Sequence, residues 1–407
     1  MHSDPVAQIV LDLLIILIGA KLMGALAHLA KQPAVLGELL FGVLLGNLDL
    51  AGIHRFEPIS TNPIVDALGR IGLLLLLFEV GLESTVGQML KVGARSLAVA
   101  LVGVVVPFAL GWAAGALLLP NASGYVHAFL GATLTATSVG ITARVLKDLA
   151  RSQTREARII LGAAVIDDVL GLVVLAVMSG VVAATARGGH LSAGEMGLVI
   201  GKASGFLVGA IAIGVAVTGR LFRLAAKVPT SGVLLALGLS VCFGLSVAAD
   251  KVGLAPLVGA FAAGLILEDL HYRDFMARGE PSLHELISPL VGFLAPVFFV
   301  LMGMHTDLRA FASTKVLALG GVLTVVAVVG KLAAGAVAGS VDRLTVGIGM
   351  VPRGEVGLVF ASIGQQLTLG GLPLVSKDNY AAILVMVILT TMMTPPALRW
   401  SLRRGAT

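Results

Sequence analysis

Charged residues are scarce in this chain of 407 residues, where Asp, Glu, Lys and Arg together account for 13%. A soluble globular domain carries about a quarter charged residues, so that class is excluded. Cysteine is almost absent, because Cys242 is the only one, and it lies in an apolar run. A single cysteine cannot form a disulfide within the chain, which argues against redox chemistry.

Hydrophobic residues replace the missing charges, at 57% of the sequence with a mean hydropathy of +1.00. This composition is typical of a polytopic membrane protein. The first apolar run, Val6 to Leu29, carries two charges and is followed at once by a second run, so we interpret it as a transmembrane helix and not a cleaved signal peptide. With about 20 apolar residues per crossing, the sequence predicts thirteen transmembrane helices, at residues 7–29, 33–48, 62–82, 92–119, 124–147, 156–184, 195–221, 230–249, 254–268, 285–304, 312–339, 342–369 and 378–401.

The connections between these helices are short and polar, and only two, near 47–62 and 268–282, have room for further structure. Basic residues indicate the orientation, because Lys and Arg concentrate in cytoplasmic loops. If the N-terminus lies outside, the inside loops collect most of them, including Lys91, Arg155 and Arg403. We therefore expect N-out, C-in topology. The net charge of +5 then reflects this topology, and no nucleic-acid partner is expected.

An internal repeat is visible in the glycines of two apolar runs. The first-half residues Gly37, Gly42 and Gly81 recur 222 residues later as Gly259, Gly264 and Gly303. Seven predicted helices separate each element from its copy, and because seven is odd, the copies face opposite ways across the membrane. Inverted repeats of this kind build secondary transporters with a site near the bilayer midplane.

Two adjacent carboxylates, Asp167 and Asp168, interrupt the apolar run ILGAAVIDDVLGLVVL. A charge near the bilayer centre costs at least ~2.5 kcal/mol, so such a pair indicates function. The 222-residue offset matches them with Leu389 and Thr390. Only one repeat therefore carries the carboxylates, which fits one ion site and not two.

Two predicted helices are interrupted at corresponding places in the two halves. The run ATLTATSVGITARVL contains Thr137, Ser138 and Gly140, and the run GIGMVPRGEVGLVF contains Pro352 and Gly354. Proline removes a backbone donor and glycine loosens the helix. Carbonyls freed at such breaks can coordinate a cation, and the half-helix ends carry partial charges of both signs.

The charged and polar residues of these segments lie at similar predicted depths. At ~1.5 Å per residue, Asp167 lies ~13.5 Å and Thr137 ~15 Å from the cytoplasmic ends of their helices. Lys331 and Glu355 both lie ~18 Å from such an end. Lys331 is too deep to extend its amine to the interface, so we expect it to pair with a buried carboxylate.

Adjacent helix residues point about 100° apart, so Asp167 and Asp168 face different surroundings. One can pair with Lys331 while the other faces a watery cavity, where hard oxygen ligands suit a small cation. Close carboxylates raise each other's affinity for protons, whereas a lysine or a bound cation lowers it. Protons and a cation are therefore expected to compete for one place.

Four segments, ILGAAVIDDVLGLVVLAV, TSVGITARVLKDL, VVGKLAAG and PRGEVGLV, together resemble the signature segments of NapA-type sodium/proton antiporters in the second monovalent cation:proton antiporter family. The resemblance covers essentially the whole membrane part of the chain. It implies an all-α polytopic membrane protein with 13 transmembrane helices, N-out/C-in topology and inverted six-helix repeats with two crossed discontinuous helices, the NhaA-like antiporter fold. It also implies a homodimer and electrogenic exchange.

The resemblance also assigns roles residue by residue. It implies that Asp168 is the main cation and proton ligand, that Asp167 pairs with Lys331 in the same ion site, and that Thr137 and Ser138 belong to the unwound stretch beside the ion. Structural or charge-balancing roles at the helix crossing are implied for a further set of residues: Gly140, Pro352, Arg353 and Glu355.

The family's domain organisation implies a dimerisation domain joined to a mobile core that moves as an elevator. The dimerisation domain is expected at 1–89 and 229–308, the core ion-transport domain at 90–184 and 309–407, and a linker helix at 185–228.

We therefore expect a Na+(Li+)/H+ antiporter of the bacterial inner membrane, embedded in the lipid bilayer, that transports small monovalent cations and protons, needs no cofactor and is not an enzyme. A K+/H+ antiporter of the glutathione-gated efflux type is an alternative, although that branch usually has Gln in place of the first aspartate and a cytoplasmic nucleotide-binding domain. A sodium-coupled symporter of the bile-acid-transporter type is a further alternative. The sequence shows no filter-like repeat that would favour a channel.

Overall fold

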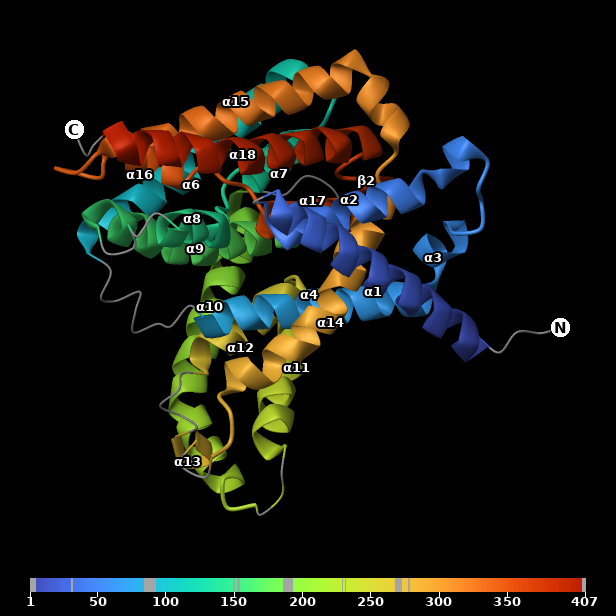
Figure 1. Cartoon of the computed structure of the whole chain (residues 1–407). Helices are drawn as coiled ribbons and strands as arrows, with labels where there is room; N and C mark the ends of the chain where they lie inside the picture. The colour runs from blue at the N-terminus through green and yellow to red at the C-terminus, as the bar shows by residue number, and fades with distance from the viewer. Residues whose placement is uncertain are drawn as a thin grey trace. The chain divides into compact units, whose positions relative to one another are not determined.

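The chain forms helices joined mostly by short connections in a computed structural model (Figure 1). The structure describes residues 5–30, 32–83, 93–148, 151, 154–185, 193–228, 230, 232–267, 273–276 and 279–404. The longer helices are α1 (Pro5–Leu29), α2 (Ala34–Gly46), α4 (Pro63–Glu83), α6 (Ala94–Leu118), α9 (Arg155–Thr185), α10 (Ala193–Ala225), α11 (Val233–Lys251), α12 (Pro256–Ile266), α14 (Leu283–Met304), α15 (Thr314–Ala336) and α18 (Lys377–Arg404). Two pairs of short helices are each separated by a break: α7 (Gly124–Thr133) with α8 (Val139–Asp148), and α16 (Arg343–Gly349) with α17 (Glu355–Gln366).

The helices agree with the ranges predicted from the sequence. A single helix or a broken pair occupies each predicted range, with bounds that differ by a few residues. Among the described residues, seven helices are long and apolar enough to cross a membrane, or eight if the bent α10 counts as one span. Helices α2 and α12 are apolar but shorter. The chain is therefore an all-helical membrane protein.

The two longer connections hold additional structure, as predicted. The first contains the 3-10 helix η1 (Leu48–Ala51) and the short helix α3 (Glu57–Thr61), and the second contains α13 (Arg273–Met276). A further 3-10 helix, η3 (Leu308–Ala312), precedes α15. These pieces lie at helix ends, so they leave the long helices uninterrupted.

A β hairpin after α17 corrects one prediction. The helix expected to continue to residue 369 ends at Gln366, and β1 (Thr368–Leu369) pairs antiparallel with β2 (Leu372–Pro373). Gly370 and Gly371 form the turn with positive φ angles of 61° and 83°. A two-residue hairpin loop favours left-handed conformations that glycine adopts without strain, which explains why the helix stops here.

The chain divides into two compact units. Unit 1 comprises Met1–Ala27, Gly37–Gly87 and Leu191–His305, and unit 2 comprises His28–Leu36, Gln88–His190 and Thr306–Thr407. Each unit thus takes segments from both halves of the sequence. Helix α10, within the range expected for a linker, falls in unit 1.

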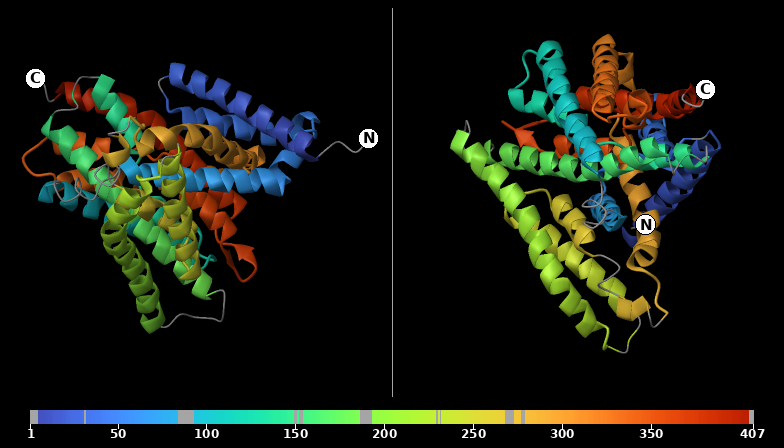
Figure 2. Two further views of the ribbon diagram at one scale, coloured as in Figure 1. Left: turned by 90° about the horizontal axis from the view of Figure 1, so that it is seen from below. Right: turned by 90° about the vertical axis from the view of Figure 1, so that its left-hand side faces the viewer.

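Within unit 1, the two repeats make matching contacts through glycine. A Cβ atom on Gly42 of α2 would lie 2.1 Å from the carbonyl oxygen of Val300 on α14, and one on Gly264 of α12 would lie 2.3 Å from that of Phe78 on α4. Gly264 lies 222 residues after Gly42, and Val300 lies 222 residues after Phe78, so the two contacts are equivalent under the repeat. Helix α12 packs against α4, α10 and α11 (Figure 2). Backbones approach closely where side chains are absent, as is usual between membrane helices.

Unit 2 contains both broken helices. Helix α15 packs against α6, α16 and α18 (Figure 1), and α6 packs against α7 and α9. A buried apolar cluster joins α6, α9, α15 and α16 through residues that include Val99, Ile160, Ala334 and Val346. Asp342 fixes the start of α16 by accepting hydrogen bonds from the first-turn N–H groups. These contacts hold the second break in place beside α9 and α15.

Candidate ion-binding site

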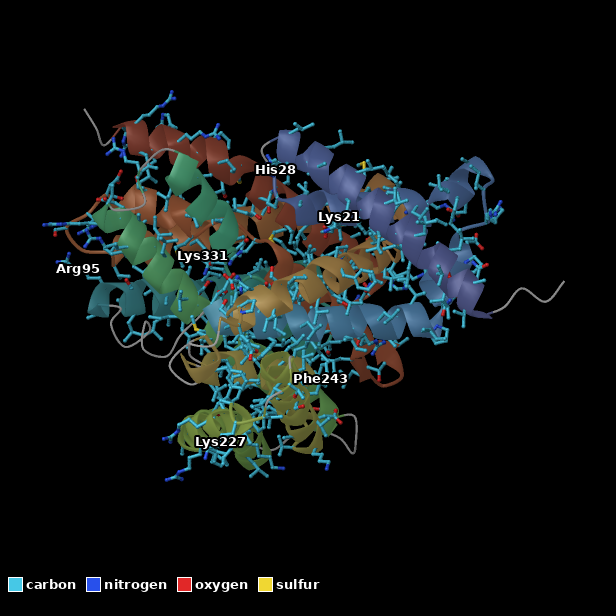
Figure 3. The ribbon with its side chains drawn as sticks, turned by 60° about the horizontal axis from the view of Figure 1, so that its bottom comes forward. Lys21, His28, Arg95, Lys227, Phe243 and Lys331 are labelled. Carbon is cyan, nitrogen blue, oxygen red and sulfur yellow. The ribbon has the colours of Figure 1, made fainter. Side chains whose placement is uncertain are left out.

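Lys331 forms a buried ion pair with Asp167. Nζ of Lys331 on α15 lies 2.9 Å from Oδ2 and 3.1 Å from Oδ1 of Asp167 on α9, and both side chains are fully buried. The lysine reaches this position past Gly103 of α6, where a Cβ atom would lie 3.2 Å from Nζ. Figure 3 shows Lys331 within the helices of unit 2, whereas Arg95 of the same unit lies at the periphery. The fold thus brings together the two residues whose pairing the sequence predicts.

The two helix breaks contact each other through the backbone. The first break separates Thr133 from Val139, and the second separates Gly349 from Glu355. The N–H of Ser138 donates to the carbonyl oxygen of Pro352 at 2.9 Å. Each break therefore satisfies part of the other's unpaired backbone, which allows both to exist in an apolar surrounding.

Two threonine hydroxyls strengthen the contact between the breaks. Oγ1 of Thr137 donates to the carbonyl oxygen of Met350 at 3.2 Å, and Oγ1 of Thr142 donates to that of Gly349 at 2.7 Å. These carbonyls lie at the C-terminal end of α16, where helical partners are missing. A Cβ atom on Gly354 would lie 2.6 Å from Oγ of Ser138, so this close approach depends on glycine.

Arg353 places a second buried cation at the first break. Its side chain is 0% exposed, and one terminal nitrogen donates to the carbonyl oxygens of Thr135, at 3.1 Å, and Ala136. Nε and the other terminal nitrogen have no hydrogen-bond partner among the residues that the structure describes. The carbonyl of Arg353 accepts a 2.6 Å hydrogen bond from Oγ1 of Thr391 on α18. Arg353 thus brings a second positive charge to the carbonyl of Thr135, which Lys331 also contacts.

The side chains of Lys331 and Arg353 both bond a carbonyl group that could otherwise bind an ion. The carbonyl oxygen of Thr135 accepts hydrogen bonds from Lys331, at 2.8 Å, and from Arg353, at 3.1 Å. A carbonyl oxygen has two lone pairs, so both are used. The carbonyl of Thr135 is therefore not available to a bound ion, whereas carboxylate and hydroxyl oxygens nearby are suitable ligands for a small cation.

Asp168 is the more accessible carboxylate of the pair. It is 8% exposed, whereas Asp167 is 0% exposed, because adjacent residues on α9 point about 100° apart. Thr137 and Ser138 on the first break are buried. The structure thus offers one carboxylate occupied by a lysine, a second with slight exposure, and two buried hydroxyls in the same unit.

The remaining predicted residues lie at or beside the breaks. Pro352 and Arg353 are in the second break, while Gly140 lies in the first turn of α8, just beyond the first break. Glu355 begins α17, but its side chain is outside the part of the chain that the structure describes.

Sequence reasoning missed the carbonyls of Thr135 and Ala136 and the hydroxyl of Thr391. Backbone carbonyls carry no residue-type signal, so only a structure could identify them. One sequence feature could have pointed to Thr391: it is adjacent to Thr390, which corresponds to Asp168 at the 222-residue offset.

Buried charges at two helix breaks in a helical membrane protein are typical of secondary transporters of ions. The chain belongs to the sodium/hydrogen exchanger family, since the model of its transmembrane region, "Sodium/hydrogen exchanger, transmembrane", matches residues 14–404.

Curated relatives and a solved structure are similar over nearly the whole chain. The high-affinity Na+/H+ antiporter NhaS3 of Synechocystis sp. is 37% identical, covering 97% of this chain and 89% of the relative. The Na+/H+-K+ antiporter GerN of Bacillus cereus is 33% identical, covering 95% of this chain and 94% of the relative. The structure of the sodium proton antiporter MjNhaP1 from Methanocaldococcus jannaschii matches with a TM-score of 0.71 at 16% identity, covering 98% of both chains. The two proteins therefore share a fold.

Proposed function

We propose that this chain is a secondary active Na+(Li+)/H+ antiporter in which the cation and protons compete at Asp168, beside the Asp167–Lys331 pair. The observation that carries the proposal is the fully buried ion pair at the meeting point of two helix breaks. Charges inside an apolar helix bundle are costly, which favours a functional reason for them. The family and the names of the relatives support sodium and protons as the exchanged ions.

The proposed cycle uses each polar group differently. Asp168 binds the cation with help from the hydroxyl oxygens of Thr137 and Ser138, which are hard ligands. Protonation of Asp168 removes the charge that holds the cation, so only one of them occupies the carboxylate at a time. A second proton is exchanged at the Asp167–Lys331 pair, which makes exchange electrogenic. Only loaded sites cross the membrane.

Arg353 keeps the empty site close to electrical neutrality. The buried residues of unit 2 include two carboxylates with two cations: Asp167, Asp168, Lys331 and Arg353. Uncompensated charge would raise the energy of the buried site far more than in water. Arg353 therefore has a charge-balancing role, with Gly140, Pro352 and Glu355 shaping the crossing.

The proposed architecture follows the NapA-type antiporters of the second cation:proton antiporter family. It has thirteen crossing helices in an N-out, C-in orientation, a homodimer formed by segments 1–89 and 229–308, a moving core of 90–184 and 309–407, and a linker at 185–228. The division into units 1 and 2 near these boundaries supports an elevator in which unit 2 carries the ion. A bacterial inner membrane is the proposed location.

Proton flux in proteoliposomes tests the proposal. An enclosed pH dye should report proton movement on addition of Na+ or Li+, across a pH series and with and without an imposed membrane potential. Asp168→Asn should abolish this flux. Asp250→Asn removes an exposed carboxylate at the end of α11 in unit 1 and should leave the flux unchanged. Sodium-dependent proton flux in Asp168→Asn would refute the site.

Potassium exchange is the second candidate, and the name of the relative GerN, which includes K+, favours testing it. The same liposomes should then respond to K+ at concentrations where Na+ gives no signal. A proton signal with Na+ alone excludes this candidate, and sodium-dependent solute uptake without proton flux would point to a symporter.

A further inference from the structure

A cavity of about 690 Å³ lies at the end of unit 2 where α15 and α18 begin. It is bounded by the connection from α6 to α7, the start of α15, and the segment from β2 into α18. Apolar residues such as Leu119, Val126 and Leu319 form much of its wall. The volume falls in the range of ligand sites, roughly 300–1,000 Å³. Because Lys315 on its rim is ~24 Å along α15 from Lys331, the cavity is separate from the candidate ion site.

Opposite charges line this cavity without neutralising each other. Lys315 on α15 and Asp378 on α18 are both exposed lining residues, and neither forms an ion pair with any residue that the structure describes. Asn379 also lines the cavity, is only 9% exposed, and its side-chain amide has no hydrogen-bond partner among the described residues. This amide is not sealed inside the protein, so a ligand in the cavity can reach it. Together with Lys315 and Asp378, it favours a ligand that carries both a negative and a positive charge.

The two sides of the cavity differ in what they attract. Ser313, which precedes α15, makes no side-chain capping bond, so N–H groups of the first turn remain available beside Lys315. At α18, by contrast, Oγ of Ser376 already accepts from the N–H of Asn379 at 3.2 Å. The α15 side therefore suits an anionic group, and the Asp378 carboxylate with the Asn379 amide oxygen suits an ammonium group that donates hydrogen bonds.

Apolar residues beside the cavity face outward. Leu117 is 81% exposed and Leu372 is 72% exposed, and Leu118 and Leu317 are also exposed. In a membrane protein such leucines contact lipid chains. The cavity thus lies where charged helix ends meet a lipid-facing surface, which is where headgroups lie. A soluble zwitterion has no acyl chains, so it would make no contact with these leucines.

We propose that this cavity binds the headgroup of an aminophospholipid such as phosphatidylethanolamine. Its phosphate lies against Lys315 and the start of α15, its primary ammonium bonds Asp378 and Asn379, and its acyl chains cover Leu118 and the neighbouring leucines. Phosphatidylcholine carries the same charges, but its quaternary ammonium has no hydrogen to donate, so it should bind more weakly.

Native mass spectrometry of the purified full-length protein, titrated with short-chain phosphatidylethanolamine, tests the proposal. We expect saturable binding of one lipid per chain, at least about tenfold tighter than phosphatidylcholine. Lys315→Gln and Asp378→Asn should each weaken binding at least about fivefold. Ala318→Phe fills the cavity while leaving both charges in place, and it should also abolish the preference.

Matched controls separate this cavity from general surface charge. Lys377→Gln removes a lysine that does not line the cavity, and Asp250→Asn removes an exposed carboxylate in unit 1. Both should bind the lipid like the unchanged protein. Equal weakening by Lys377→Gln, unchanged binding in Ala318→Phe, or binding of soluble glycerophosphoethanolamine as tight as that of the lipid would each overturn the proposal.

Discussion

The amine of Lys331 contacts both carboxylate oxygens of Asp167, at 2.9 and 3.1 Å, and neither side chain reaches the surface. Removing two charges from water is expensive, and their attraction repays the cost only when the remaining polar groups are also satisfied. Here the lysine has a third acceptor, the carbonyl oxygen of Thr135 at 2.8 Å. The pair is thus stable only as a whole, and the loss of one member has a predictable result.

Lys331→Met should destabilise the protein by about 3–5 kcal/mol, because it leaves the Asp167 carboxylate buried and unpaired. Thermal unfolding of the purified protein in detergent measures the effect. The double change Asp167→Asn with Lys331→Met removes both charges and should recover much of the loss. Lys251→Met, at the exposed end of α11, should change little. A single and a double variant of equal stability would contradict the coupling.

Arg353→Lys should cost about 1.5–3 kcal/mol, because lysine keeps the charge but is too short to reproduce the terminal nitrogen that donates to the carbonyls of both Thr135 and Ala136. Arg353→Met should cost more, since the charge is lost as well. Arg343→Lys is the control, because this exposed arginine donates to a single carbonyl, that of Gly339 at 3.3 Å. Unfolding midpoints that do not distinguish Arg353→Lys from Arg343→Lys would show that these two buried hydrogen bonds are unimportant.

Gly42→Ala and Gly264→Ala should destabilise unit 1 by similar amounts, about 1–3 kcal/mol each, because the added methyl group overlaps a backbone carbonyl in both repeats. Gly244→Ala is a matched control in α11, where a Cβ atom would meet nothing within 4 Å. That change should be neutral or stabilise by about 0.5–1 kcal/mol, since alanine favours helix. Loss of stability at only one of the two repeat positions would contradict their equivalence.

His54 should titrate above its ordinary pKa of about 6.5, because its ring nitrogen hydrogen-bonds the Glu57 carboxylate at 2.7 Å and the negative charge favours the protonated ring. A raised pKa means that this pair stabilises the loop fully below about pH 6.5, and that the contribution disappears as the pH rises through the pKa of the folded protein. NMR of labelled histidine measures the pKa. Glu57→Gln should return it towards 6.5, and an unchanged value would show that Glu57 is not the cause.

Much of the site could be predicted because its members have local signals. The two aspartates stand out in an apolar run. The rise per residue of a helix then places Lys331 at a similar depth in the membrane. Pro352 and Gly354 mark the second break by backbone chemistry alone. The hydrogen bonds from Arg353 to the first break could not be predicted, because extended breaks have no periodicity that fixes where carbonyls point.

The hairpin after α17 shows the same limit on a smaller scale. Gly370 and Gly371 adjoin a helical pattern, and glycines elsewhere in this chain lie inside helices. Gly42 and Gly264 could be matched by their 222-residue offset, but only the structure shows that each meets a backbone carbonyl. The role of a glycine therefore depends on its surroundings as much as on its neighbours in sequence.

The sequence by itself determined that this protein lies in a membrane, where most of its helices run, that glycines recur at a 222-residue offset, and that Lys331 can pair with a buried aspartate. These properties follow from the composition of the chain, the lengths of its apolar runs and the spacing of its residues, which are visible without knowing how distant segments pack. Only the tertiary structure decided which groups meet at the breaks, since Arg353 and Thr135 are 218 residues apart. Their contact depends on how several packed helices position two irregular segments, and no local pattern encodes it.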